Sequence, residues 1–223
     1  MSRQDTSQAA MKAVFPAGFA LPAAPSRPGY PAKRVLDVVL AGLLLVLLSP
    51  MLALVSLAIL LDSRGPLLFW QTRTGLNGRI FPIFKFRSMH VVEDGADVRQ
   101  VVDGDIRVTR VGRIIRKLSL DELPQLLNVI AGDMSLVGPR PHALVHDEYY
   151  GAAISNYAVR QQVKPGITGW AQVNGARGAT PTLAVMQRRV EFDAWYVVHA
   201  NFALDLKILA RTPLEVVRPR NTT

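Results

Sequence analysis

The chain has 223 residues, enough for one domain with a substantial core and too few for two comfortable ones. Its formal charge of +9 at pH 7 predicts anionic partners, such as nucleic acid, acidic lipid headgroups or a phosphorylated substrate. Because the chain contains no cysteine, a disulfide scaffold, a thiolate metal site and a cysteine nucleophile are excluded.

The first segment, residues 1–32, is rich in Ala, Pro and Ser, and its prolines prevent a regular helix. It also lacks the ordered basic region, apolar region and cleavage site of a secretory signal. We therefore predict a flexible tail that stays attached to the chain.

Residues 33–63 are predicted to form a membrane helix. The stretch 38–61 carries no charge, and at about 1.5 Å per residue it can cross a hydrocarbon core of roughly 30 Å. Its apolar residues occupy every face of the helix, which argues against a buried core helix. Ser49 and Pro50 lie in the middle, where the proline must bend the helix. The sequence is therefore compatible with a kinked membrane span and with a re-entrant hairpin.

Basic residues flank this helix on both sides. They are Arg27, Lys33 and Arg34 before it, and Arg64, Arg73, Arg79, Lys85 and Arg87 after it. The positive-inside rule makes both flanks cytoplasmic, and a helix that enters and leaves by the same face satisfies both. We therefore favour re-entrance at Ser49-Pro50, with residues 64–223 forming a cytoplasmic domain.

The domain is expected to start with a short β-hairpin. Two apolar, aromatic runs flank Asn77-Gly78, which is a favourable turn pair. Lys85 and Arg87 lie two residues apart and would point to the same face of the second strand. They form either a solvated strand face or an anion site. A polar loop over 93–107 and a short basic helix over 109–118 follow.

Two adjacent acids, Asp121 and Glu122, mark the start of the next helix, which Gly132 is suited to end. Ser119 with Glu122 fits a capping box, whereas Pro124 fits better in a helix capped at Asp121. Both arrangements place the acids in a positively polarised first turn.

Cations surround this acidic pair in the sequence, namely Arg110, Arg113, Arg116, Lys117 and Arg140. Arg140 lies between two prolines, which restricts its backbone and suits a phosphate clamp. A carboxylate near several arginines should stay ionised and can act as a nucleophile or metal ligand, while its neighbour binds Mg²⁺ or moves a proton.

The last part of the chain contains two helical stretches, 186–199 and 203–217, that mix basic and apolar residues. This pattern is typical of amphipathic helices in a membrane interface, and packing against the domain core would produce it too. For Trp170, the sequence is equally compatible with a location at the headgroup boundary of the membrane and with a location in the core of the domain. The four histidines have no metal-ligand spacing.

Several segments together carry a resemblance to a known family: "KRVLDVVLA", Ser49-Pro50, "FKFRSM", "RVTRVGRIIRKLSLDELPQLLNVIAGDMSLVGPRP" and "VKPGITGWAQVNGARG". They resemble the bacterial sugar transferase family, the monotopic phosphoglycosyl transferases that initiate exopolysaccharide, O-antigen and glycan assembly. The resemblance extends over residues 33–217, which is nearly everything except the tail. It implies a mostly helical α/β fold with a re-entrant membrane helix, at the cytoplasmic face of the bacterial inner membrane.

The resemblance also implies a reaction. A UDP-sugar donates its sugar-1-phosphate to undecaprenyl phosphate, and UMP is released. Asp121 and Glu122 match the family's catalytic dyad, in which Asp121 would form an aspartyl phosphosugar and both acids would serve Mg²⁺. The expected phosphate and nucleotide ligands, by the same similarity, are Arg116, Arg140, Lys85, Arg87 and Arg177. Ser49 and Pro50 match the pair that makes the family's helix re-entrant.

One departure concerns the sugar. Many hexose-specific relatives have Gly-Glu-Thr where this chain has Gly178-Ala179-Thr180. If that glutamate contributes to sugar choice or metal binding in those relatives, Ala179 does not supply the same group. Glucose or galactose remains the predicted sugar.

Two other classes of protein share some of these sequence features. A membrane-tethered nucleic-acid-binding protein would explain the charge, but no DNA-binding motif is present and the arginines cluster around acids that a phosphate backbone would repel. A non-catalytic scaffold of a polysaccharide system would not need Asp121. We therefore expect a UDP-sugar, undecaprenyl phosphate and membrane lipids as partners, without nucleic acid. A homodimer is among the oligomeric states that are compatible with the sequence.

Overall fold

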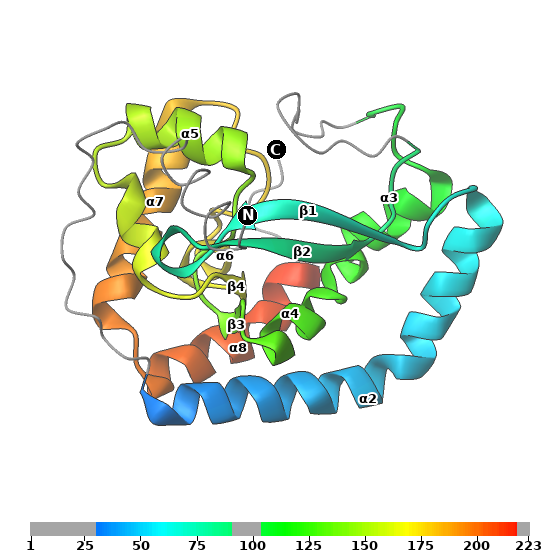
Figure 1. Cartoon of the computed structure of the whole chain (residues 1–223), viewed down its shortest axis with the longest axis horizontal. Helices are drawn as coiled ribbons and strands as arrows, with labels where there is room; N and C mark the ends of the chain where they lie inside the picture. The colour runs from blue at the N-terminus through cyan, green and yellow to red at the C-terminus, as the bar shows by residue number, and fades with distance from the viewer. Residues whose placement is uncertain (1–29, 91–103, 218–223) are drawn as a thin grey trace, which may run out of the picture.

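The computed structural model describes residues 30–90 and 104–217. Nearly all of the predicted tail over residues 1–32, and most of the predicted loop over 93–107, lie outside these ranges. In the described part, one long helix, α2 (Pro31–Asp62), runs along the edge of a domain of shorter helices and two small sheets (Figure 1). The protein is therefore mostly helical with some β-structure, as predicted.

Helix α2 is continuous and bends along its length (Figure 1). Pro50 lies inside it and lacks the N–H that would donate to the carbonyl of Val46. The hydroxyl of Ser49 donates to this carbonyl instead, at 2.8 Å, which satisfies the group that the proline leaves unpaired. The structure thus gives a reason for the Ser-Pro pair, but it shows one bent helix and does not show the predicted hairpin.

The N-terminal end of α2 is fixed to the domain by polar contacts. Buried Asp37 accepts hydrogen bonds from Ser135 Oγ at 3.0 Å and from the amide of Leu136 at 2.9 Å. Lys33 pairs with the buried carboxylate of Asp205. A charged or polar group of α2 is therefore buried only where the domain supplies a partner.

The C-terminal end of α2 is fixed to the same domain. Ile59 packs against Phe86 and Ile115, and Asp62 Oδ2 accepts a hydrogen bond from the amide of Val111 at 3.0 Å. Both ends of one long apolar helix thus contact a single domain.

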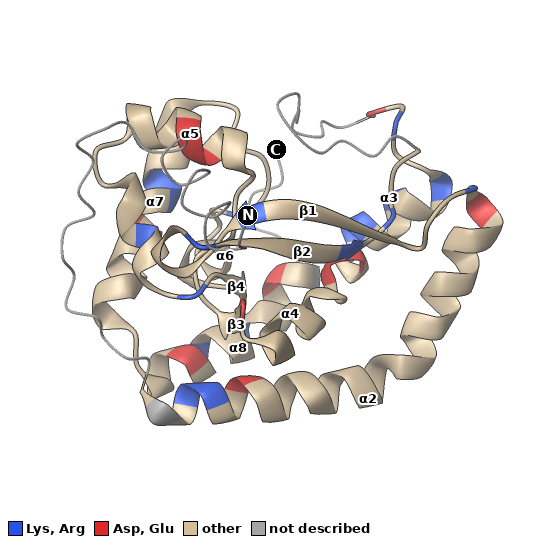
Figure 2. Ribbon diagram, viewed as in Figure 1, with Lys and Arg blue, Asp and Glu red and all other residues tan. Residues whose placement is uncertain are grey.

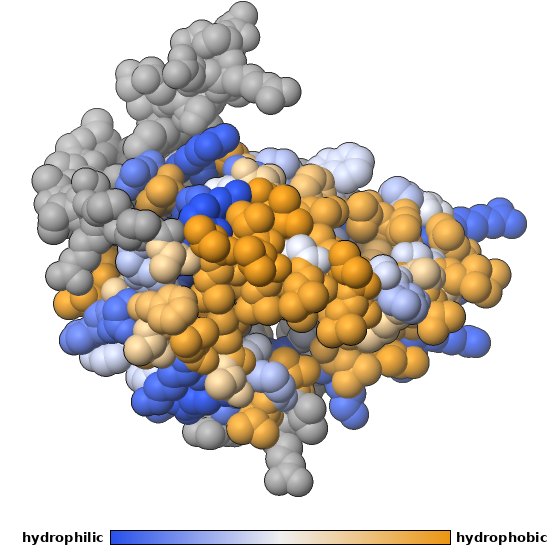
Figure 3. Space-filling view, turned by 90° about the horizontal axis from the view of Figure 1, so that it is seen from below, coloured by the Kyte–Doolittle hydropathy of each residue, from blue (hydrophilic) through white to orange (hydrophobic). Residues whose placement is uncertain are grey.

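The outward surface of α2 remains apolar. Within the described ranges, Ala32–Asp62 is the one helix long and apolar enough to cross a membrane. Figure 3 shows a broad apolar surface on the side of the molecule along which α2 lies. The exposed apolar side chains of the helix are Val35, Val38, Val39, Leu43, Val46, Leu47, Leu54, Leu57, Leu60 and Leu61.

The predicted β-hairpin is confirmed. Strands β1 (Leu68–Thr74) and β2 (Ile80–Phe86) pair antiparallel. The connecting turn, η1 (Leu76–Gly78), needs positive φ at Asn77 and Gly78, with values of 53° and 76°. Asparagine and glycine are the residues that adopt this conformation at least cost, which is why this pair specifies the turn.

Helix α4 (Gln125–Ala131) attaches to the free edge of the hairpin through one side chain. Asn128 Oδ1 accepts from the amide of Phe84 at 3.0 Å, and Asn128 Nδ2 donates to the carbonyl of Pro82 at 2.7 Å. The buried amide therefore replaces a neighbouring strand. The predicted end of this helix at Gly132 is also confirmed, since its φ is 93°.

A second sheet lies behind the hairpin. Its strands β3 (Ser135–Val137) and β4 (Gly166–Thr168) pair in parallel. Gly138 and Gly166 let the two chains approach closely, because a Cβ on Gly166 would lie 2.1 Å from the nitrogen of Gly138. This close approach sets the path of the chain into residues 139–141.

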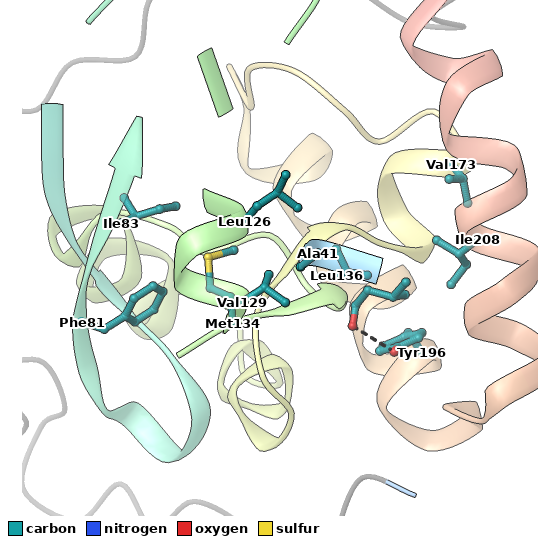
Figure 4. Close-up of a cluster of buried hydrophobic side chains, with 11 residues drawn as sticks. Ala41, Phe81, Ile83, Leu126, Val129, Met134, Leu136, Val173, Tyr196 and Ile208 are labelled. Carbon is teal, nitrogen blue, oxygen red and sulfur yellow. Dashed lines mark hydrogen bonds between the residues drawn. The ribbon is translucent and has the colours of Figure 1, made fainter. Parts of the chain in front are cut away.

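The core lies between these sheets and the helices, as Figure 4 shows. It combines Phe81 and Ile83 of β2 with residues of α4, β3 and the C-terminal helices. Tyr196 crosses this core and donates to the carbonyl of Val137 at 3.2 Å. The principal buried residues are Ala41, Phe81, Ile83, Leu126, Val129, Met134, Leu136, Val137, Val173, Tyr196 and Ile208.

The remaining elements are helical, and the predicted basic helix is among them. They are α3 (Arg110–Lys117), α5 (Leu144–Ala153), η3 (Tyr157–Gln162), α6 (Trp170–Val173), α7 (Leu183–His199) and α8 (Phe202–Val217). The two predicted C-terminal helices are confirmed as α7 and α8, and each has one face in the core and exposed apolar residues on the other. Trp170 is half-buried and stacks on Trp195 with ring centroids 4.7 Å apart.

Replacing Asn128 by leucine tests the attachment of the hairpin. The change leaves the Phe84 amide and the Pro82 carbonyl without partners, so the free energy of unfolding should fall by about 2 to 4 kcal/mol. Chemical denaturation in detergent micelles measures this loss. As a control, Asn201→Ala removes an exposed hydrogen bond to the amide of Leu204 and should cost only about 1 kcal/mol. Equal losses in the two variants would contradict the role given to Asn128.

Candidate active site

The two acids lie on a short 3₁₀ turn, η2 (Leu120–Glu122), and not in the first turn of an α-helix. Ser119 precedes this turn with φ of 56°, and its side chain makes no capping hydrogen bond. Its hydroxyl accepts from Arg177 instead. Helix α4 begins after Pro124 and has no side-chain cap. Both predicted capping arrangements, at Ser119 and at Asp121, are therefore wrong, because Ser119 Oγ binds Arg177 and neither η2 nor α4 has a side-chain cap.

Glu122 is held by two cations. Arg140 Nη1 donates to Oε2 at 2.8 Å and Arg140 Nη2 donates to Oε1, while Lys85 Nζ donates to Oε1 at 3.1 Å. Burial alone would raise the pKa of Glu122, but the charges of Arg140 and Lys85 hold it well below its ordinary value. Glu122 in turn raises the pKa of Arg140. The carboxylate is therefore ionised and fixed in orientation by a bidentate pair.

Asp121 has a different environment, although it is the next residue along the chain. Its side chain is buried, with 6% exposure, and no hydrogen bond to its carboxylate is found within the described ranges. Burial and the charge of Glu122 raise its pKa to about 6, against the opposing charges of Lys85, Arg116 and Arg140. Asp121 is thus the more basic of the two carboxylates, and within the described ranges no hydrogen bond holds it.

The structure brings Lys85 to the dyad and leaves Arg87 outside it. Lys85 lies on β2 and reaches Glu122, and burial lowers its pKa although Glu122 opposes this shift. Arg87 follows the strand and donates instead to the carbonyl of Ser63, at 2.6 Å, and to that of Ile59, at 3.4 Å. A basic side chain at these carbonyls stabilises the C-terminal end of α2. The predicted shared anion site of Lys85 and Arg87 is therefore not formed.

Arg116 and Arg177 lie at the edge of the dyad. Arg116 contacts Ser88 Oγ at 3.4 Å, and its charge lowers the pKa of Asp121. Arg177 donates to Ser119 and to the carbonyl of Glu215, the latter at 3.0 Å. Burial and the charge of Arg140 lower the pKa of Arg177, whereas Glu122 and Asp121 raise it. Figure 2 shows basic and acidic residues meeting between the end of β2, α3 and the start of α4.

The donor set fits Mg²⁺ only partially. Within the described ranges no cluster of three or more His, Asp or Glu side chains could enclose a metal ion. The carboxylate of Asp121 is not engaged in hydrogen bonds there, whereas Glu122 is already bound by Arg140 and Lys85. Mg²⁺ commonly binds one or two carboxylates and takes its remaining ligands from substrate phosphates and water. The site therefore suits a Mg²⁺ ion that arrives with a phosphorylated substrate.

A second group of buried charges was not predicted from the sequence. Arg160 of η3 lies between His142, Asp147 and Asp193, and contacts the main chain of Arg140. Burial and the charge of Arg160 hold the pKa of His142 well below its ordinary value, so this imidazole is neutral. In the sequence, this group of buried charges was indicated by one feature. Arg189 and Asp193 have opposite charges and lie four residues apart in a predicted helix with an apolar face.

Comparison with known proteins identifies relatives of this chain. The family model for "Bacterial sugar transferase" matches residues 29–219. The chain is 59% identical over 180 residues to the UDP-glucose:undecaprenyl-phosphate glucose-1-phosphate transferase of Caulobacter vibrioides, covering 81% of this chain and 67% of that protein. It is 52% identical over 180 residues to the protein of the same name from Escherichia coli, covering 81% of this chain and 39% of that protein.

A relative with a different sugar in its name is also found. The UDP-N-acetylgalactosamine-undecaprenyl-phosphate N-acetylgalactosaminephosphotransferase of Aeromonas hydrophila is 42% identical over 182 residues, covering 81% of this chain and 42% of that protein. The chain thus spans two thirds of the Caulobacter protein and about two fifths of the other two.

The pKa of Asp121 predicts how stability depends on pH in the Asp121→Asn variant. Because folding raises this pKa from 3.8 to about 6, the contribution of the Asp121 carboxyl group to stability decreases as pH rises through this interval, and the variant lacks this contribution. The free energy of unfolding of the variant relative to wild type should therefore increase by about 2 to 3 kcal/mol between about pH 4 and pH 7. Denaturation in detergent with EDTA over this pH range measures it.

Glu122→Gln is the matched control. Because the folded protein holds the pKa of Glu122 below its ordinary value, the contribution of the Glu122 carboxyl group to stability increases as pH rises, and the glutamine variant should become less stable relative to wild type. If both variants changed with the same sign, the division between the two acids would be wrong.

Proposed function

Because the chain belongs to the bacterial sugar transferase family, we propose that it transfers glucose-1-phosphate from UDP-glucose to undecaprenyl phosphate and releases UMP. The names of the Caulobacter and Escherichia coli relatives support this donor and this acceptor. The product, a lipid-diphosphate-linked glucose, would begin the assembly of an exopolysaccharide or glycan.

The proposed chemistry is supported by the different environments of two neighbouring acids. Glu122 is ionised and bound by Arg140 and Lys85, while Asp121 is buried, basic and free of hydrogen bonds within the described ranges. A nucleophile needs an accessible lone pair, and a neighbour that is already engaged cannot supply it. Asp121 is therefore the proposed nucleophile, and Glu122 orients the cations beside it.

The reaction proceeds in two displacements at one phosphorus atom. A carboxylate oxygen of Asp121 attacks the phosphorus that carries glucose, and the bond to the bridging oxygen breaks, so that this oxygen leaves with UMP. A phosphate oxygen of undecaprenyl phosphate then attacks the same phosphorus, and the bond to Asp121 breaks. The carboxylate is restored and the kinetics are ping-pong.

Cations of this chain neutralise the phosphates during both steps. Arg116 and Arg177, which lie beside the dyad, are proposed to contact the diphosphate of the donor together with Arg140. Mg²⁺, when bound with the substrate by Asp121, neutralises further charge on the phosphoryl oxygens. Arg87 is no longer proposed as a phosphate ligand, because its guanidinium lies at the end of α2.

The contacts at the two ends of α2 support a proposal for the membrane arrangement. Its N-terminal end contacts β3 and α8 through Asp37 and Lys33, and its C-terminal end contacts α3 through Asp62. One domain can hold both ends only if both lie on the same side of the bilayer. We therefore propose that α2 is re-entrant, bends at Ser49-Pro50, and keeps the domain at the cytoplasmic face of the inner membrane.

Release of UMP tests the proposed reaction. Protein in detergent or nanodiscs is given Mg²⁺ and undecaprenyl phosphate with UDP-glucose, UDP-galactose, UDP-N-acetylglucosamine or UDP-N-acetylgalactosamine in separate reactions. We expect sustained release with UDP-glucose, dependent on the lipid and lost with EDTA. The Asp121→Asn variant should retain membrane binding and lose about 10⁴-fold or more of the turnover.

Three results would contradict this proposal. Faster turnover with another donor would give the enzyme a different sugar. Substantial activity in the Asp121→Asn variant would show that Asp121 is not the nucleophile. Inactivity of folded wild type with every donor would favour a scaffold protein.

Single cysteines test the topology without background, because the natural chain has none. Ala32 and Arg64 are exposed at the two ends of α2. A cysteine at either position should react with an impermeant maleimide in inverted vesicles. Neither cysteine should react when the reagent is added to the outside of intact cells. Cysteine at exposed Leu47, in the middle of the helix, should be protected. Labelling of the two ends from opposite sides would exclude re-entrance.

A further inference from the structure

Two of the cations beside the dyad lie on segments without regular secondary structure. Arg140 lies between Pro139 and Pro141 after β3, and Arg177 lies between α6 and α7. A loop residue needs external support if its side chain is to keep one position, because its own backbone provides no ladder of hydrogen bonds. The question is which part of the fold gives this support.

Helix α7 holds the segment of Arg177 directly. Arg189, which is buried with 4% exposure, donates from Nε to the carbonyl of Ala176 at 3.0 Å and from Nη2 to the carbonyl of Gly178 at 2.7 Å. These carbonyls lie on either side of Arg177. The fork of one guanidinium therefore fixes the main chain that carries the other.

Helix α7 holds the segment of Arg140 through a second guanidinium. Asp193, one turn after Arg189, accepts from Arg160 Nη2 at 3.1 Å and from Nε at 3.2 Å. Arg160 Nη2 also donates to the carbonyl of Arg140 at 2.5 Å. The side chain of Arg140 points the other way, to Glu122. Arg160 thus contacts the main chain of the residue whose side chain holds the dyad.

The guanidinium of Arg160 has partners besides Asp193 and the carbonyl of Arg140. Its Nη1 lies 2.6 Å from His142 Nδ1 and 3.0 Å from the hydroxyl of Tyr157. Because a guanidinium only donates, His142 Nδ1 is the acceptor, which agrees with a neutral imidazole. Arg160 is 5% exposed and Asp193 is 1% exposed. A buried group with so many fixed partners has one orientation, as a positioning group requires.

We propose that Arg160 and Arg189 are positioning residues, anchored on α7, that set Arg140 and Arg177 relative to the Asp121-Glu122 dyad. This inference rests on the proposed function for its consequence in turnover. Helix α7 is then the shared support of both loops, through a pair of oppositely charged residues four positions apart. Neither guanidinium touches a reacting atom, so each acts through the arginine that it supports.

A double-mutant cycle tests this. Arg160→Met in wild-type background should lower kcat/KM for UDP-glucose by about 10- to 100-fold, the usual range for a residue that orients a functional group. In Arg140→Met background the same change should lower it by less than about threefold, because the residue it positions is gone. Arg160→Lys, which keeps the charge and one donor, should recover part of the loss.

Arg34→Met is the matched control. Arg34 also donates to main-chain carbonyls, those of Val129 at 2.5 Å and Ile130 at 2.7 Å, but it does not contact the Arg140 segment. Its loss should lower kcat/KM by the same factor in both backgrounds. If Arg160→Met behaved like this control, with equal losses in both backgrounds, Arg160 would be merely structural and the inference would be wrong.

A structural measurement separates this inference from the proposed reaction. Should folded wild type show no turnover with UDP-glucose, the proposed function fails, and crystal structures of wild type and Arg160→Met decide the positioning role alone. Displacement of the Arg140 guanidinium from Glu122 in the variant supports it. An unchanged Arg140–Glu122 pair overturns it. For Arg189, the parallel comparison is the position of the Arg177 guanidinium in wild type and in Arg189→Met.

Discussion

The bidentate pair between Arg140 and Glu122, completed by Lys85, is the interaction on which the rest of the site depends. It resolves the problem of two adjacent carboxylates in a buried position, because one acid is neutralised by fixed cations and the other is left basic. In the proposed reaction Asp121 is therefore the nucleophile, and the two acids do not exchange roles. The pair also joins three separate segments, since Lys85 comes from β2, Glu122 from η2 and Arg140 from the loop after β3.

The fold can be understood as the support for this pair. Asn128 attaches the hairpin that carries Lys85 to the helix that follows the dyad. The close approach of Gly138 and Gly166 directs the chain into the Arg140 segment. The same domain holds both ends of α2. If α2 is re-entrant as proposed, the anchors that secure the helix also fix the height of the dyad relative to the bilayer, where a soluble nucleotide and a lipid phosphate can both reach it.

Local features of the fold were predictable because short-range chemistry determines them. The turn at Asn77-Gly78 and the end of α4 at Gly132 each depend on the backbone preferences of one or two residues. Ser119 shows where this reasoning fails: its sequence context predicts a cap, but Arg177, far along the chain, takes its hydroxyl. Arg87 fails similarly, because two residues of separation in the sequence do not reveal that one side chain faces Glu122 and the other the end of α2. Arg160 could not be found, since its role exists only once η3, α7 and the Arg140 segment are packed together.

The identity of the nucleophile can be tested most directly by trapping the covalent enzyme. Wild-type protein is mixed with UDP-glucose and Mg²⁺ without the lipid acceptor, quenched, and analysed by intact mass and peptide mapping. A single phosphoglucose adduct on Asp121, formed together with one equivalent of UMP and discharged on addition of undecaprenyl phosphate, is the result that the account predicts. An adduct on Glu122 or another residue, or full turnover without any adduct on Asp121, would contradict it.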